Sequence, residues 1–183
     1  MNPITLLQPA KIVFGTGCLE QFCKDYIAMG HKRLFVLTAP VIRPMIADME
    51  QTLTSAGVNI CYFDDIRQEP SVADFKRILA EAQHFGADSV IGVGGGSVLD
   101  LSKLVATLIN SEQQIEDLFG IGLVAQRGVW FACMPTTSGT GSEVSPNAIL
   151  LDERDALKGV TVVDAQSKPH GVVAVLGQGG NVI

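Results

Sequence analysis

Short, almost wholly apolar runs alternate along this chain with segments in which apolar residues recur at helical spacing. The predicted strands are residues 34–38, 58–63, 89–93 and 129–134, and the predicted helices between them are residues 44–56, 72–82 and 98–108. Strands that are joined by helices pair in parallel through right-handed crossovers, and a parallel sheet is covered on both faces. The alternation therefore predicts an α/β fold with a mostly parallel sheet and helices on both faces.

Further elements are predicted at the two ends of this unit. Residues 11–17 are expected to add an N-terminal edge strand, and residues 148–151 and 159–163 to form a C-terminal hairpin around a charged turn. We expect the α/β domain to span residues 1–165. The glycine-rich residues 166–183 are expected to form an irregular tail.

The predicted helix over residues 72–82 is bounded by residues that are typical of helix ends. Ser71 is followed three residues later by Asp74, which has the spacing of a capping box. Gly86 follows the last apolar position and predicts a left-handed C-cap.

The composition restricts the classes of protein to which the chain can belong. Of its 183 residues, 47% are hydrophobic and 17% are charged, which excludes a disordered tail. The net charge of −6 lacks the basic surplus of a nucleic-acid reader. No apolar run approaches the roughly 18 residues of a membrane helix, no signal peptide is visible, and the four cysteines lack metal-ligand spacing. We therefore expect a cytoplasmic protein that binds neither nucleic acid nor membranes.

A glycine cluster lies between a predicted strand and a predicted helix, where Gly94, Gly95 and Gly96 are followed by Ser97 and Asp100. Ligands of open α/β sheets bind at such strand ends, and the N–H groups of a helix N-terminus favour phosphate. We predict a phosphate-binding turn, in which Ser97 caps the helix or donates its hydroxyl to a phosphate. The alternative is a tight strand-to-helix turn without a ligand. The spacing matches neither the G-x-G-x-x-G fingerprint nor a Walker loop.

Asp100 and Lys103 stand three residues apart on the predicted helix, away from its apolar stripe. One interpretation is a surface ion pair of little energetic weight. The other places Asp100 beside a bound cofactor, and the spacing alone does not decide between them.

A second polar cluster, residues 134–145 (MPTTSGTGSEVS), again follows a predicted strand. Hydroxyl groups such as those of Thr136, Thr137 and Thr140 could bind ribose, phosphate or carboxamide groups. The alternative is a solvated polar loop.

The two clusters together resemble those of the iron-containing alcohol dehydrogenase family. Residues 94–103 (GGGSVLDLSK) are similar to the pyrophosphate-binding segment of that family, and residues 135–150 (PTTSGTGSEVSPNAIL) to its most diagnostic loop. Residues 14–17 (FGTG) also fit. The resemblance covers roughly the first 160 residues and implies a Rossmann-like cofactor-binding domain of the dehydroquinate synthase-like kind.

The resemblance also implies which residues hold NAD or NADP. The glycines of the turn, together with Ser97 and Asp100, would lie along the pyrophosphate and nicotinamide. The threonines of the second cluster would contact the adenosine half and its ribose, and Lys158 would lie near the nicotinamide ribose. Some members carry an Asp after the strand that matches residues 34–38, where it repels the 2′-phosphate of NADP. Here Ala39 stands at that position, so the cofactor is expected to be either NAD or NADP.

The family reaction is hydride transfer between a small alcohol or aldehyde and NAD(P)(H), with a divalent metal, commonly iron, that polarises the oxygen. The family's metal ligands, one Asp and three His, come from a further all-helical domain. This chain ends at Ile183, and His31, His84 and His170 have no ligand spacing. We therefore expect the metal domain, the metal ligands and the catalytic residues to be absent from these 183 residues. The chain alone is expected to bind NAD(P)(H) at most weakly and not to turn over an alcohol.

Two other hypotheses stay open. The chain could be a non-catalytic nucleotide-binding or dimerising fragment, because a missing domain would leave an apolar face that favours association. A homodimer or homo-oligomer is expected in either case. The chain could instead be a glycerol dehydrogenase or dehydroquinate synthase-like enzyme, since these relatives share the glycine turn but diverge in the second loop.

Overall fold

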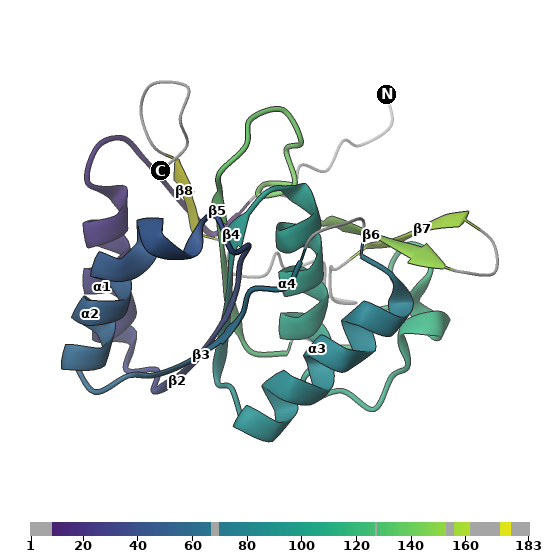
Figure 1. Ribbon diagram of the computed structural model, residues 1–183. Helices are drawn as coiled ribbons and strands as arrows, with labels where there is room; N and C mark the ends of the chain where they lie inside the picture. Colours follow the sequence, from purple (N-terminus) through teal and green to yellow (C-terminus); the bar gives the residue numbers. More distant parts are fainter. Residues whose placement is uncertain (1–8, 67–69, 127, 153–155, 162–172, 177–183) are drawn as a thin grey trace.

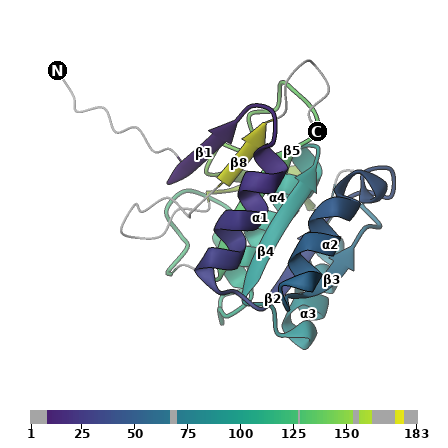
Figure 2. The ribbon, with the colours of Figure 1, turned by 90° about the vertical axis from the view of Figure 1, so that its left-hand side faces the viewer.

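The computed structural model describes residues 9–66, 70–126, 128–152, 156–161 and 173–176. Its centre is a six-stranded sheet of order β1-β8-β5-β4-β2-β3, in which all neighbouring strands are parallel. The strands are β1 (Lys11–Phe14), β2 (Arg33–Leu37), β3 (Asn59–Phe63), β4 (Ser89–Gly94), β5 (Trp130–Pro135) and β8 (Val173–Leu176). The predicted fold class is confirmed, and β1 is the expected strand at one edge (Figure 2).

Helices cover both faces of the sheet (Figure 1). On one face lie α1 (Cys18–Met29) and α2 (Ala47–Ser55), and on the other lie α3 (Val72–Phe85) and α4 (Gly96–Leu108). A 3-10 helix, η1 (Arg43–Ile46), leads into α2, and a second one, η2 (Ile115–Leu118), follows α4. No helix among the described residues is both long enough and apolar enough to span a bilayer.

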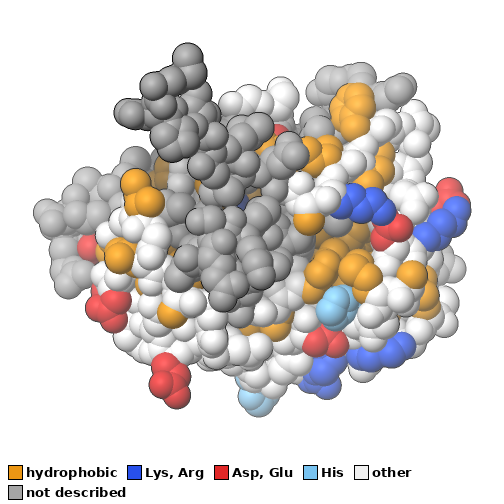
Figure 3. Space-filling view, turned by 180° about the vertical axis from the view of Figure 1, so that it is seen from behind, with side chains coloured by type: hydrophobic (Ala, Val, Ile, Leu, Met, Phe, Trp, Pro, Cys, Tyr) orange, Lys and Arg blue, Asp and Glu red, His pale blue; other side chains and the backbone are white. Residues whose placement is uncertain are grey.

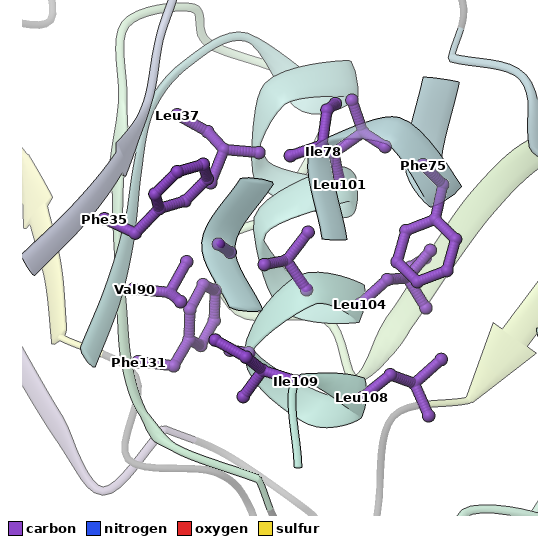
Figure 4. Packing of buried hydrophobic residues seen from close by; sticks show 14 of the residues in the cluster. Phe35, Leu37, Phe75, Ile78, Val90, Leu101, Leu104, Leu108, Ile109 and Phe131 are labelled. Carbon is purple, nitrogen blue, oxygen red and sulfur yellow. The ribbon is translucent and has the colours of Figure 1, made fainter. Parts of the chain in front are cut away.

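Each face of the sheet has its own apolar core, because successive strand side chains point to opposite faces. In β2, Leu34 and Val36 pack beneath α1 and α2, whereas Phe35 and Leu37 pack beneath α3 and α4. Figure 4 shows the second core, where side chains of α4 lie between those of the strands and Phe75 of α3. The sheet is thus buried on both sides, as its near-continuous apolar strands require.

The helix ends follow the local sequence signals. The Ser71 hydroxyl accepts a hydrogen bond from the Asp74 N–H, and the Asp74 carboxylate accepts one from the Ser71 N–H, so the predicted capping box is present. Gly86 ends α3 with φ +70°, as predicted. The helix expected over residues 44–56 starts as η1, with a proline in its first turn.

Two elements correct the sequence-based prediction. The extent of helix α1 was not predicted, although Phe22, Cys23 and Tyr26 of its buried face stand at helical spacing. Residues 166–183 were expected to be an irregular tail, yet Val173–Leu176 form β8, which pairs with both β1 and β5. Its continuous apolar run, VAVL, suits a strand with neighbours on both sides. The expected domain boundary at residue 165 lies outside the described residues.

The C-terminal hairpin is present and stands apart from the main sheet (Figure 1). Strands β6 (Asn147–Asp152) and β7 (Ala156–Thr161) are antiparallel and form a two-stranded sheet. On the face of the molecule that is turned away from the viewer in Figure 1, apolar, acidic and basic side chains of the described residues are intermixed (Figure 3).

Replacing Ser71 by alanine should lower the free energy of unfolding by about 1 kcal/mol, because the capping hydroxyl is lost. The hydrogen bond from Ser71 holds the pKa of Asp74 below its usual value. A carboxyl with a depressed folded-state pKa stabilises the fold above its unfolded pKa of about 4 and stops doing so as the pH falls through the folded pKa. The stability difference between parent and Ser71→Ala should therefore shrink in acid.

Urea unfolding at several pH values measures this difference. Ser55→Ala, at an exposed position at the end of α2, is the matched control and should change stability by less than about 0.5 kcal/mol. Equal effects of the two substitutions would contradict the capping role.

Candidate functional site

The site lies at the point where the strand order reverses. From β2 the chain moves outward to the edge strand β3 and then returns to β4 on the other side of β2. In open α/β sheets, the carboxyl ends of the strands at such a point form the ligand crevice. The Thr38 hydroxyl joins the two ends by donating to the Val93 carbonyl at 2.8 Å, and Ala39 follows directly after Thr38.

The glycine turn forms the junction between β4 and α4. Strand β4 ends at Gly94, Gly95 is the N-cap residue of α4 in an extended conformation, and the helix begins at Gly96. No side chain caps this helix, so the N–H groups of its first turn are available to a ligand. Ser97 lies within the first turn, and its predicted role as the cap is therefore wrong.

The glycines serve two different packing needs. A Cβ on Gly92 would lie 2.1 Å from the Ser102 Oγ, and one on Gly94 would lie 2.8 Å from the Val98 Cγ2. These two glycines therefore let α4 lie close against β4. In contrast, Gly95 and Gly96 face the second polar cluster, and Cβ atoms added to them would lie at ordinary to slightly tight distances from its side chains.

Thr137 and Thr140 of that cluster cover the turn. A Cβ on Gly95 would lie 3.4 Å from the Thr137 Oγ1, and one on Gly96 would lie 3.2 Å from the Thr140 Cγ2. The Thr136 N–H donates to the Gly94 carbonyl at 2.9 Å and fixes the start of the loop over residues 136–146. The two clusters that sequence reasoning singled out are therefore in contact.

Asp100 and Lys103 form an ion pair of 2.8 Å, but the pair is not on the surface. The Lys103 side chain is 2% exposed and that of Asp100 is 15% exposed. The interpretation as a surface pair is wrong because β6 packs on this face of α4. The predicted contact of Asp100 with a cofactor stays a prediction.

A cleft of about 440 Å³ lies between the start of α4, the loop and β6, within the usual size range of ligand pockets. Four of the predicted residues line it, namely Gly96, Ser97, Asp100 and Thr140. Its other lining residues are Pro70, Ser142, Ser145, Asn147, Ile149 and Leu151.

None of these other residues was predicted as a site residue, although Ser142, Ser145, Asn147 and Ile149 lie within residues 135–150, the loop that resembles the family. Pro70 carried no sequence signal. It reaches the cleft because the Leu151 N–H donates to its carbonyl at 2.9 Å.

The remaining predicted residues are not among those that line this cleft. Gly94 and Gly95 form the turn behind it, Thr136 and Thr137 begin the covering loop, and Ala39 lies at the end of β2. Lys158 is in β7, paired with Leu150 of β6.

The other reactive groups of the described residues do not form a second centre. Burial raises the pKa of the Cys133 thiol and keeps it neutral. His31 packs against Tyr26 and Trp130 at the opposite, amino end of the sheet. Among the described residues no group of three His, Cys, Asp or Glu side chains could hold a metal ion.

A family profile described as iron-containing alcohol dehydrogenase matches residues 9–175. A sulfoacetaldehyde reductase from Bilophila wadsworthia is 33% identical over 150 residues, which cover 81% of this chain and 39% of that protein. Long-chain-alcohol dehydrogenase 1 from Geobacillus thermodenitrificans is 33% identical over 190 residues, which cover 92% of this chain and 48% of that protein. The chain thus spans less than half the length of these two relatives.

A solved structure of a protein from the same family has a similar fold. A crystal structure of an iron-containing alcohol dehydrogenase from Thermotoga maritima superposes with a TM-score of 0.80 at 27% identity. The superposition covers 93% of this chain and 47% of that one.

Replacing Gly94 by alanine should lower the free energy of unfolding by about 1–3 kcal/mol, because the new methyl group would overlap both the Cβ and the Cγ2 of Val98. Rotation of the Val98 side chain does not relieve the contact with its Cβ. Urea unfolding measures the loss. Gly159→Ala, where nothing lies within 4 Å of the new methyl group, is the control and should change stability by less than about 0.5 kcal/mol. A Gly94→Ala variant as stable as this control would show that α4 does not need the close approach.

Proposed function

The chain belongs to the iron-containing alcohol dehydrogenase family, and from this we propose that it is the cofactor-binding part of an NAD(P)-dependent alcohol dehydrogenase or aldehyde reductase. The observation that carries the proposal is the contact between the glycine turn and the threonine loop beside the uncapped N-terminus of α4. A dinucleotide needs such a combination, since its pyrophosphate requires N–H donors and close approach to the backbone.

The chain's own residues fit a nicotinamide dinucleotide. The first-turn N–H groups of α4 and the hydroxyl of Ser97 would bind the pyrophosphate, and Thr136, Thr137 and Thr140 would hold the adenosine half. Lys158 of β7 would contact the nicotinamide ribose. When it is bound, the nicotinamide ring supplies hydride exchange with an alcohol or aldehyde carbon. The protein's contribution is to bind the cofactor and fix its orientation.

The described residues do not fit the iron that the family name implies, since they hold no cluster of ligands. Their proposed role is therefore limited to the cofactor. We propose a small alcohol or aldehyde as the substrate class, by analogy with relatives named for sulfoacetaldehyde and long-chain alcohols. That the chain alone does not turn over an alcohol stays a prediction.

Cytoplasmic location and self-association also stay predictions. None of the four cysteines, which all lie among the described residues, forms a disulfide, as is usual for proteins of reducing compartments. Ile12 and Phe14 of the edge strand β1 are 50% and 68% exposed, and a second copy could cover this apolar edge.

Gly95→Asp should abolish NADH and NADPH binding, because it sets a carboxylate beside the pyrophosphate and against Thr137. Titration of NADH fluorescence measures binding, and circular dichroism checks that the variant is folded. Gln51→Asp, which adds the same charge at an exposed position of α2 on the other face of the sheet, should bind like the parent. A folded Gly95→Asp variant with the parent's affinity would refute the phosphate site.

Ala39→Asp should weaken NADPH binding by at least about tenfold relative to NADH, since a carboxylate at the end of β2 repels a 2′-phosphate. The parent, with alanine there, should bind both cofactors with affinities that differ less. Parallel titrations with NADH and NADPH test this. An unchanged affinity ratio would place the adenosine ribose away from the end of β2.

A further inference from the structure

The ion pair of Asp100 and Lys103 on α4 is more deeply buried than the surface ion pairs of the described residues, such as Lys24–Glu20 and Arg77–Asp74. The Lys76–Glu116 pair, for example, has side chains that are 51% and 33% exposed, whereas the Lys103 side chain is 2% exposed. Removing a charge from water is costly unless hydrogen bonds replace the lost hydration. The groups that form hydrogen bonds with Asp100 and Lys103 therefore show which part of the chain this pair holds in place.

Those partners are backbone groups of β6 and the loop before it. The Lys103 ammonium donates to the carbonyls of Ser145, at 3.3 Å, and Asn147. The Asp100 carboxylate accepts the N–H of Ile149 at 3.1 Å and the hydroxyl of Ser142. Every polar contact of the pair beyond its own salt bridge thus leads to residues 142–149.

The pair takes the place of a neighbouring strand along β6. Backbone groups of residues two apart in a strand point to the same edge, so the Asn147 carbonyl and the Ile149 N–H lie on one edge while β7 pairs with the other. An unpaired edge would leave such groups without partners. Asp100 and Lys103 supply these partners and attach the hairpin to α4.

The same contacts fix the far end of the covering loop. Its start is held by the hydrogen bond from Thr136 to Gly94, and its end by the contacts of Ser142 and Ser145 with the ion pair. Between these two anchors lie Thr137 and Thr140, which cover Gly95 and Gly96.

We propose that Lys103 is a positioning residue of the cofactor site: its ammonium holds the loop over residues 136–146 against the glycine turn before any ligand arrives. This inference rests on the proposed function. Lys103 does not line the cleft and so acts through the loop. A loop that is ordered in advance costs a ligand less conformational entropy on binding.

The test combines hydrogen exchange of the free protein with titration of NADH. In Lys103→Met, loop amides such as those of Ser142 and Ser145 should exchange at least about tenfold faster, while the amides of β2 keep the parent's rates. The dissociation constant for NADH should rise at least about tenfold. Lys76→Met, which removes an exposed ion pair, should match the parent in both measurements.

A second variant separates positioning from stability. Lys103→Met leaves the Asp100 carboxylate without its cation, which destabilises the fold. In the double variant Asp100→Asn/Lys103→Met no charge is left unpaired, and the amide can still accept from Ile149 and donate to Ser142. We expect thermal stability to recover, while loop exchange stays fast and NADH binding stays weak. Recovery of slow loop exchange and of affinity together with stability would overturn the proposal.

The remaining outcomes are also decisive. Loop exchange in Lys103→Met at the parent's rate, or acceleration of loop and β2 amides by the same factor, would refute a local positioning role. Fast loop exchange with unchanged NADH affinity would refute its link to the cofactor. If the parent itself does not bind NADH or NADPH, the proposed function fails, whereas the exchange rates still decide whether Lys103 holds the loop.

Discussion

The close approach of α4 to β4 is the constraint on which the rest of the site depends. Gly92 and Gly94 leave no room for a Cβ between the strand and the helix. The helix therefore begins immediately at the carboxyl end of a central strand, with its N-terminus beside the reversal point of the sheet. A helix N-terminus at that position is the fixed positive end of a dipole in the place where ligands of α/β sheets bind.

Everything else at the site is attached to this helix. The threonine loop packs on the two glycines that follow β4, and the hairpin is joined to α4 through Asp100 and Lys103. The Pro70 carbonyl, just before α3, accepts a hydrogen bond from Leu151 of β6 in this hairpin. Pro70 and the continuous stretch from the threonine loop through β6, which are distant in sequence, thus meet beside the first turns of α4.

Much of the fold could be predicted from the sequence, because its signals are local. The strands around Phe35 and Val90 are apolar runs, and the capping box of Ser71 requires only residues three apart. The bounds of helix α1 were not predicted although its apolar spacing is helical, and β8 was missed because a glycine-rich stretch follows its apolar run. The strand order places β8 between β1 and β5, and its pairing with β1 spans more than a hundred residues, which no local pattern reveals.

The sequence by itself determined the alternation of strands and helices, the family of the chain and the two clusters that are proposed to bind the cofactor, since each depends on the type and spacing of neighbouring residues. Only the tertiary structure decided why the glycines are needed and what Asp100 and Lys103 do. Glycine is required where a Cβ would collide with Ser102 or Val98, and an ion pair is buried where another strand covers it. Both are properties of packing between distant segments, and the spacing of residues along one helix cannot express them.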